Sequence, residues 1–221
     1  AINNDLNGVY VLTADIDVSG VTTGNSIIRD NFKGLLKGNG HRITGLKIPL
    51  FNFINKGTVE DLILADGEIN RPNQNRIGVL ACEVYDRSVI QNVYVRNMKI
   101  HGGTLVGGLI GHLNESTAIG CSVVAQVDGK EAGGFISNIM RGSTVKDCYA
   151  QRTTDPKTFG STADVQGGFV AKMNKSTVTN TYAELKFVEG ADTSKITAKV
   201  GSYIGANGTG DTIPAKVENN I

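Results

Sequence analysis

The sequence contains no tryptophan, only 4 prolines and 3 histidines among 221 residues, and no apolar run as long as a membrane span. A membrane-crossing helix needs about 20 consecutive apolar residues, so we expect no membrane insertion. The chain also lacks an excess of one charge, because 22 basic residues are balanced by 21 acidic ones. Nucleic-acid-binding proteins carry basic surfaces, so we expect no nucleic-acid partner.

Cysteine is scarce, with Cys82, Cys121 and Cys148 showing neither a disulfide framework nor C-x-x-C spacing. Cys121 and Cys148 occupy equivalent positions in successive copies of a repeat, so stacked copies would place them one strand spacing, about 4.8 Å, apart. We predict buried reduced thiols that pack as small apolar side chains. A disulfide between the two is the alternative.

The sequence also lacks the minimum constellation of a catalytic or metal site. His41, His101 and His112 are not part of an H-E-x-x-H helix or another ligand spacing. No G-x-S-x-G elbow is present, and Cys82 has no identifiable histidine partner. We predict no catalytic residues, no metal ligands and no cofactor in this chain, and the binding residues stay unknown.

What the chain does contain is a repeat. Five stretches, 57–62, 88–93, 116–121, 143–148 and 176–181, share one pattern. The first large apolar side chain ahead of each copy forms a series, Leu50, Leu80, Leu109, Phe135, Phe169 and, in a weaker sixth copy, Tyr203. A unit this short cannot bury its own apolar face, so neighbouring units must stack around a continuous core.

Within each unit the apolar positions alternate in short β-branched runs, and Gly makes up 28 residues, which suits short strands and tight turns. We predict an all-β fold, a right-handed parallel β-helix of about six coils that forms one domain over residues 1–221. Residues 1–31 would form an N-terminal cap and a leading strand, 32–204 the coils and 205–221 a C-terminal tail. The chain begins without Met or a signal sequence, so we expect a segment of a larger protein. We also expect it to be a monomer.

Two recurring features have structural explanations. One column follows the first strand of each copy and consists of Asp61, Asn92, Gly120, Asp147 and Asn180. We expect a left-handed backbone there, which these residue types tolerate. The pairs Gly107-Gly108, Gly133-Gly134 and Gly167-Gly168 predict close backbone approach at a tight corner, because they lack the Lys and Ser/Thr of a phosphate loop.

Three loops interrupt the coils, Asn70 to Arg76, Gln151 to Val165 and Ala183 to Lys199, and loops are where solenoids bind partners. Arg71, Asn73 and Arg76 would project from the first loop, and a solvated polar loop without a contact role is the alternative. A second column, His112 with Glu83, Asn138 and Lys172, is expected to face solvent.

The stretch from Phe32 to Leu46, F-K-G-L-L-K-G-N-G-H-R-I-T-G-L, is similar to a signature that opens the β-helical region of bacterial surface proteins. Residues Tyr10 to Asp17 precede it, and Gly107 to Gly111 resembles the GLUG motif. Together they resemble the β-helix region of streptococcal immunoglobulin A1 protease-type zinc metalloproteases. Leu36-Lys37 replaces the usual Phe-Asp, and the H-E-x-x-H motif of the proteases is absent, so no catalytic residue carries over.

The resemblance implies a secreted, wall-attached parent enzyme whose zinc lies in a catalytic domain outside this segment. It implies a non-catalytic module that recognises, orients or spaces a host glycoprotein substrate such as an immunoglobulin. An adhesin or structural β-helix of a bacterial surface protein is the alternative. A lyase acting on polysaccharides rests on fold analogy alone.

Overall fold

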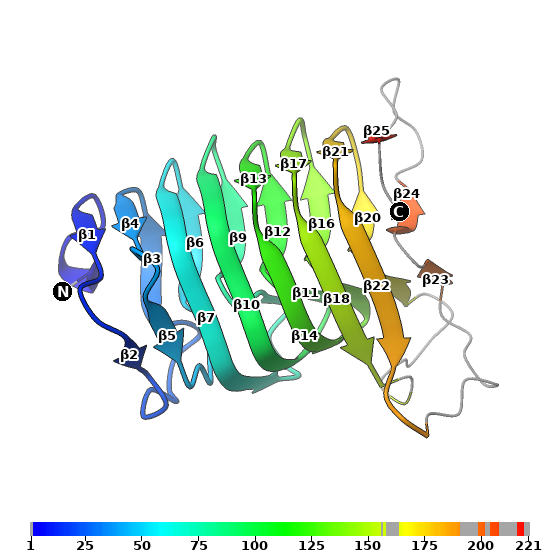
Figure 1. Cartoon of the computed structure of the whole chain (residues 1–221), viewed down its shortest axis with the longest axis horizontal. Coiled ribbons are helices and arrows are strands. Elements are labelled where there is room, and N and C mark those ends of the chain that lie inside the picture. The colour runs from blue at the N-terminus through cyan, green and yellow to red at the C-terminus, as the bar shows by residue number, and fades with distance from the viewer. Residues whose placement is uncertain are drawn as a thin grey trace.

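A computed structural model describes residues 2–155, 157, 164–190, 199–201, 204–207 and 216–218. After a single 3-10 turn, η1 (Ile2–Asn4), the described chain consists of strands arranged in three sheets. Figure 1 shows successive units lying side by side along the long axis of the molecule, with the N-terminus at one end. The fold is therefore all-β and resembles a β-helix, as the repeat predicted.

Sheet A has 13 strands, and its long strands lie on the near side in Figure 1. They are β1 (Val9–Val11), β2 (Ile16–Asp17), β4 (Leu35–Lys37), β5 (Arg42–Thr44), β7 (Thr58–Arg71), β10 (Val89–Gly102), β13 (Thr117–Ile119), β14 (Ser122–Asp128), β17 (Thr144–Lys146), β18 (Tyr149–Thr154), β21 (Thr177–Thr179), β22 (Tyr182–Phe187) and β25 (Lys216–Glu218).

Sheets B and C complete each unit and have 7 and 5 strands. Sheet B contains β3 (Ile28–Phe32), β6 (Phe51–Asn55), β9 (Ala81–Tyr85), β12 (Ile110–Asn114), β16 (Ile136–Met140), β20 (Val170–Met173) and β24 (Ile204–Asn207). Sheet C contains β8 (Arg76–Ile77), β11 (Leu105–Gly107), β15 (Glu131–Gly133), β19 (Val165–Gly167) and β23 (Lys199–Gly201). The strand pairs are parallel.

The predicted apolar series forms a stacked column in the core. The Leu80 amide donates to the Leu109 carbonyl at 3.0 Å, and the Leu109 amide donates to the Phe135 carbonyl at 2.8 Å. Phe135 and Phe169 stack with ring centroids 4.7 Å apart. Leu80, Leu109, Phe135 and Phe169 are fully buried, and Leu50 is nearly so. Tyr203 lies outside the described residues, so its place in the column stays a prediction.

The column of Asp61, Asn92, Gly120, Asp147 and Asn180 has the predicted left-handed backbone, with φ between 49° and 65°. The structure adds a feature that the sequence did not suggest. The Asn92 side-chain amide donates to the Asp61 carboxylate at 2.9 Å, and the Asn180 amide donates to the Asp147 carboxylate at 3.1 Å. The column is thus linked along the stack by side chains as well as by the backbone.

The paired glycines lie where backbones approach one another, as predicted. A Cβ on Gly107 would overlap the carbonyl oxygen of Ile110, and a Cβ on Gly108 would overlap that of Gly134. These glycines are needed because the backbone packs closely within each unit and between neighbouring units. The space beside each glycine pair is filled by backbone atoms and leaves no room for a ligand.

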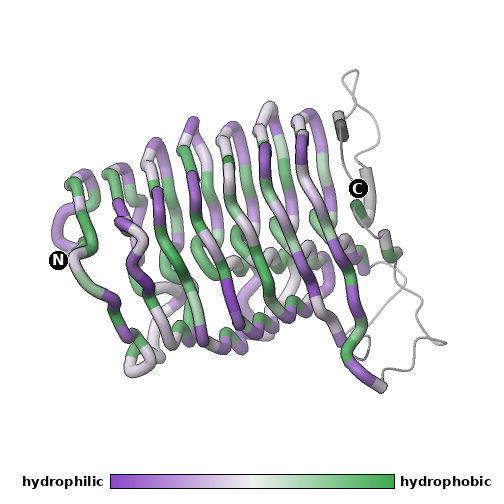
Figure 2. Tube along the Cα trace, in the orientation of Figure 1, coloured by the Kyte–Doolittle hydropathy of each residue, from purple (hydrophilic) through white to green (hydrophobic). Residues whose placement is uncertain are grey.

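Residues 1–31, expected to form a cap and a leading strand, contain η1, β1, β2 and most of β3. Strand β1 pairs with β4, and β2 pairs with β5. Val9 and Val11 of β1 are 69% and 51% exposed. Figure 2 shows apolar and polar residues interspersed along the strands.

Replacing Leu109 with alanine is expected to lower the free energy of unfolding by about 2 to 5 kcal/mol, because a fully buried side chain leaves a cavity between its stacked neighbours. Urea unfolding followed by circular dichroism measures this change. Val9→Ala, at a residue 69% exposed, serves as the control and should change the stability little. Equal effects of the two substitutions would contradict the assignment of Leu109 to the core.

Candidate functional site

The strongest candidate contact surface is the first predicted loop, which connects β7 to β8. Asn25 and the six residues from Asn70 to Asn75 line a hollow of about 550 Å³. Four asparagines, one glutamine and one arginine supply most of its lining. Such a lining offers many donors and acceptors and little apolar surface, so it suits a polar partner.

Hydrogen bonds hold the shape of this loop. The Arg71 guanidinium donates to the Thr22 carbonyl at 2.6 Å, and the Gln74 amide nitrogen donates to the Asn25 carbonyl at 3.3 Å. The Arg76 guanidinium pairs with Glu83 at 2.8 Å. Of the three side chains expected to project, Arg71 and Arg76 are therefore engaged with neighbouring segments, and Asn73 is exposed.

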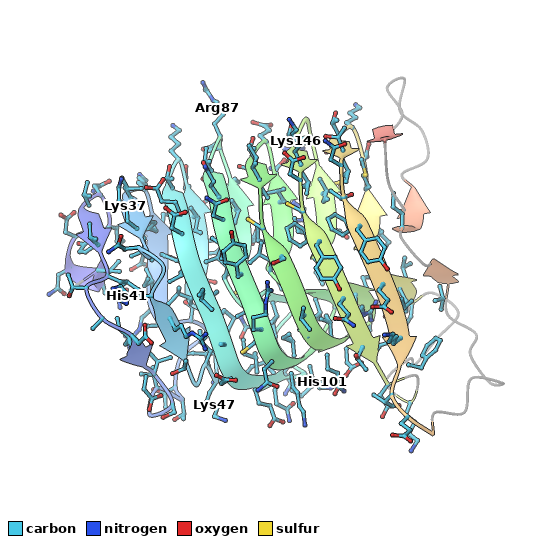
Figure 3. The ribbon with its side chains drawn as sticks, viewed as in Figure 1. Lys37, His41, Lys47, Arg87, His101 and Lys146 are labelled. Carbon is cyan, nitrogen blue, oxygen red and sulfur yellow. The ribbon has the colours of Figure 1, made fainter. Side chains whose placement is uncertain are left out.

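The hollow continues along the same edge of the molecule. A second hollow of about 230 Å³ is lined by Pro72, Asn75, residues 101–104, Gly129 and Lys130. Because Pro72 and Asn75 line both hollows, the two form one polar edge beside the ends of β7, β10 and β14. We call this surface the loop edge, and His101 in Figure 3 marks its position.

The other two predicted loops are shorter than expected where the structure describes them. Residues 151–154 belong to β18, and residues 183–187 belong to β22. The remainder of each loop lies largely outside the described residues. Any contact role for these two loops stays a prediction.

The three histidines lie in different places. His41 lies beside Asp15, with its Nδ1 3.3 Å from Oδ1 of the carboxylate, to which it donates when Nδ1 carries the proton. The pKa of Asp15 is lowered, first by the hydrogen bond from the Arg42 amide and then by His41. His101 pairs in register with Asn70 and Asp128. The histidines therefore do not form a common site.

The column of Glu83, His112, Asn138 and Lys172 has the predicted register. The expectation that it faces solvent is wrong at Asn138, which is only 7% exposed. His112 is half-buried, and burial lowers its pKa. This histidine is therefore mainly neutral at pH 7, which is not evident from its sequence neighbours.

The three cysteines are buried free thiols. The Cys121 amide donates to the sulfur of Cys148 at 3.4 Å, so the two thiols lie in adjacent copies of the repeat as predicted. Burial raises the pKa of Cys82 to about 12 and raises the pKa of Cys148 well above its ordinary value. The predicted burial of Cys121 and Cys148 is confirmed, and their redox state stays a prediction.

These thiols are expected to react slowly with iodoacetamide at pH 8 in the folded chain and rapidly in urea, because the native sulfurs are buried. Mass spectrometry measures the labelling. The free energy of unfolding should also fall as the pH rises above 9.0, the ordinary thiol pKa, towards about 12. The unfolded chain loses its thiol protons first in this range, which favours unfolding.

A Cys82→Ala variant should show a smaller decrease in stability over the same pH range. Rapid labelling of the native chain at two or more cysteines would contradict the burial of the thiols.

Sequence reasoning missed one buried polar cluster, centred on Arg152. This side chain is fully buried and donates to the carbonyl oxygens of Val127, Ala132 and Gly167 at 2.8 to 3.0 Å. The alternation of Ala150, Arg152 and Thr154 on the inward face of β18 is the signal that could have revealed it. Because Arg152 is fully buried and bonded to backbone carbonyls, we assign the cluster a structural role.

Among the described residues, no helix is long and apolar enough to cross a membrane. No group of three His, Cys, Asp or Glu side chains in this part of the chain could hold a metal ion.

Comparison with known proteins shows which protein family this chain resembles. Residues 1–97 match the family model described as the M26 IgA1-specific metallo-endopeptidase N-terminal region. An immunoglobulin A1 protease of Streptococcus sanguinis is 31% identical over 199 residues, which cover 83% of this chain and 11% of that protein. The chain is related to the N-terminal region of the M26 metallo-endopeptidases.

Two further comparisons agree with this assignment. The zinc metalloprotease ZmpC of Streptococcus pneumoniae is 28% identical over 158 residues, covering 65% of the chain and 8% of that protein. A solved structure of an IgA1 protease superimposes with a TM-score of 0.81 at 23% identity, over 100% of this chain and 18% of the other. That likeness concerns the fold. The chain spans about a tenth of the length of its M26 relatives.

Proposed function

We propose that the chain is a non-catalytic module of a secreted, cell-surface zinc endopeptidase of the immunoglobulin A1 protease type, which recognises or orients a host glycoprotein such as an immunoglobulin. The observation that carries the proposal is the loop edge, a polar surface held in place by a stack of sheets. Stacked units present an extended surface, which suits a large partner better than a small ligand.

We also propose that the chain forms a right-handed β-helix of about six coils. The right-handedness is supported by the general rule that parallel crossover connections are right-handed. We propose that the module is monomeric. The zinc implied by the names of the relatives would lie in a catalytic domain of the parent, since the described residues do not fit a metal ion.

Deletion of the module from the full-length parent enzyme tests the recognition role. We expect kcat/KM on an intact glycoprotein to fall while cleavage of a short peptide from its cleavage site stays nearly unchanged, because the peptide does not reach the module. Equal loss on both substrates would contradict recognition and indicate a folding role. No loss on either would indicate a passive spacer.

A single substitution tests the loop edge itself. Asn73→Trp places a large side chain over the hollow and should lower kcat/KM on the glycoprotein, with the peptide as internal control. Val9→Trp, at an exposed site at the end of sheet A remote in the stack, is the matched variant and should leave both rates unchanged. Equal behaviour of the two variants would exclude the loop edge as the contact surface.

A further inference from the structure

A hollow on the outer face of sheet A has no part in the proposed function. Its volume is about 290 Å³, and it is lined by Asn39, Gly40, Asp61, Ile63 and Tyr94. Ile63 and Tyr94 belong to β7 and β10, which lie side by side on the near side in Figure 1. Sites for small molecules begin at about 300 Å³, so the hollow is large enough for one small ring and too small for a long ligand.

An insertion in the first unit forms one side of this hollow. Residues 38–41 connect β4 to β5, and the strand register sets them opposite residues 61–62 alone. The corresponding step on β10 consists of residues 92–93. The first unit thus has two extra residues at this corner, and they form a turn beside the hollow. His41, labelled in Figure 3, ends this turn.

Backbone hydrogen bonds fix the turn. The His41 amide donates to the Gly38 carbonyl at 2.9 Å. The two residues between them, Asn39 and Gly40, have positive φ of 53° and 77°, which is the geometry of a type I′ turn. The Gly40 amide also donates to the Asp61 carbonyl at 2.8 Å. The position of Asn39 beside the hollow is therefore set by the backbone.

Ile63 belongs to a row of outward residues on sheet A. On successive strands the row consists of Arg42, Ile63, Tyr94, Ser122, Tyr149 and Tyr182. Ile63 is smaller than the tyrosine next to it, so it forms the floor of the hollow and Tyr94 forms a wall.

Arg96 lies against the other side of this wall. Its guanidinium carbon is 5.6 Å from the centroid of the Tyr94 ring. The guanidinium also donates to the Ser122 hydroxyl at 2.7 Å, on the β14 side of Tyr94. The ring face towards β14 is therefore covered, and the face towards β7 borders the hollow.

Two polar side chains of the lining keep unused hydrogen-bonding capacity. One Asp61 oxygen accepts from the Asn92 amide at 2.9 Å, and the other has no donor in the described part of the chain. The side-chain amide of Asn39 likewise has no partner among the described residues. A carboxylate accepts hydrogen bonds, and an amide both donates and accepts them. The hollow can therefore bind ligand hydroxyls as donors and as acceptors.

The charges around the hollow favour an uncharged ligand. The Asp61 carboxylate belongs to the lining and repels an anion. A cation would be repelled by Arg96, which already occupies the other face of the Tyr94 ring. Arg42, the neighbour of Ile63 in the row, is a further positive charge on the adjacent strand.

We propose that this hollow binds an uncharged pyranose sugar of a glycan, with the C–H face of the sugar on the Tyr94 ring and its hydroxyls bonded to Asp61 and Asn39. A pyranose carries C–H groups on its faces and hydroxyls around its rim. An aromatic wall beside a carboxylate and an amide matches both parts of such a ring. The inference deepens the proposed recognition role, on which its biological meaning rests, by naming the chemical class of the contact.

An extended peptide fits this face less well. Such peptides add to a sheet edge, where unpaired backbone groups are available. Here β7 is paired with β4 and β5 on one side and with β10 on the other. Only side chains are therefore offered to a ligand, and a single aromatic wall above a small apolar floor suits one ring.

Saturation-transfer NMR on the 221-residue chain tests the site with the methyl β-glycosides of glucose and galactose and with their uronic acid counterparts. Each uronic acid differs from its neutral sugar by a carboxylate at C6. We expect saturable binding of at least one neutral glycoside with a Kd of about 1 mM, and binding of its uronic acid weaker by about tenfold. Saturation should be strongest on the hydrogens of one face of the sugar ring.

Asp61→Asn removes the charged acceptor and should lower the affinity for the neutral glycoside about tenfold. The substitution keeps an acceptor for the Asn92 amide and suits the left-handed corner, which holds asparagine at Asn92 and Asn180. Asp147→Asn is the matched control, because Asp147 has the same left-handed backbone and accepts from Asn180 but does not line the hollow. That variant should bind as the unaltered chain does.

Ile63→Tyr fills the hollow and should abolish binding of every glycoside. The row already carries tyrosine on β10, β18 and β22, so sheet A accommodates this side chain. Circular dichroism checks that each variant folds, and Ile63→Tyr tests the site even if Asp61→Asn does not fold.

The proposal is overturned if no neutral glycoside saturates, if the uronic acids bind as tightly, if Asp61→Asn binds as Asp147→Asn does, or if Ile63→Tyr still binds. Tighter binding of N-acetyl-leucinamide would also overturn it and indicate a peptide partner. Failure of this titration leaves the comparison of Asn73→Trp with Val9→Trp in the parent enzyme unaffected, so the two proposals fail separately.

Discussion

Replacing Arg152 with alanine is expected to lower the free energy of unfolding by about 4 kcal/mol. The guanidinium is fully buried and satisfies the carbonyl oxygens of Val127, Ala132 and Gly167 together with the side chain of Gln166. Burial lowers its pKa to about 10, so it stays charged at pH 7. Its removal leaves a cavity and takes the guanidinium donors away from these oxygens, of which that of Gly167 keeps another donor, the Gly134 amide at 3.2 Å.

Urea unfolding followed by circular dichroism measures the loss. Arg29→Ala removes an exposed arginine and should change the stability little. Arg152→Lys should also destabilise the chain, since an ammonium cannot reproduce the planar arrangement of donors. If Arg152→Ala were as stable as the control, the guanidinium would not be holding these carbonyl groups.

Replacing Gly133 with alanine should destabilise the fold by about 3 kcal/mol or more, and the altered chain is expected to accumulate poorly in soluble form. The added Cβ would overlap the carbonyl oxygen of Ile136, and the next atoms in its path belong to backbone, which cannot rotate away. Thermal unfolding and the soluble yield measure the effect.

Gly20→Ala is the matched control, because a Cβ at Gly20 meets nothing within 4 Å and its φ is not in the left-handed region. That variant should be as stable as the unaltered chain or slightly more stable, since alanine restricts the unfolded state. A Gly133→Ala chain of unchanged stability would mean that the corner can open, contrary to the packing described above.

The features that the sequence predicted are those that recur in every copy. The core column from Leu50 to Phe169 and the left-handed column from Asp61 to Asn180 each place similar residues at the same position of successive copies. Because the copies stack, residues at the same position are in contact. The glycine corners were predictable for the same reason, because two successive residues without side chains recur where strands turn.

The features that were missed depend on neighbours from other units. Asn138 is buried although its column was expected to face solvent, and Arg152 finds its acceptors on β14, β15 and β19. A repeat indicates which strands are adjacent but not how unlike side chains fill the space between them. The row from Tyr94 to Tyr182 was predictable in principle, because each tyrosine follows an inward position of the repeat.

In every sheet the ladder hydrogen bonds join one unit to the next, so they run along the stack. A pulling force applied at the two ends would load the hydrogen bonds of the outermost unit first. The units would therefore separate one after another. The 29 residues between Leu80 and Leu109 would then be released together, adding about 100 Å of extended chain at each step. The module would thus lengthen in discrete increments under tension while its remaining units stayed folded.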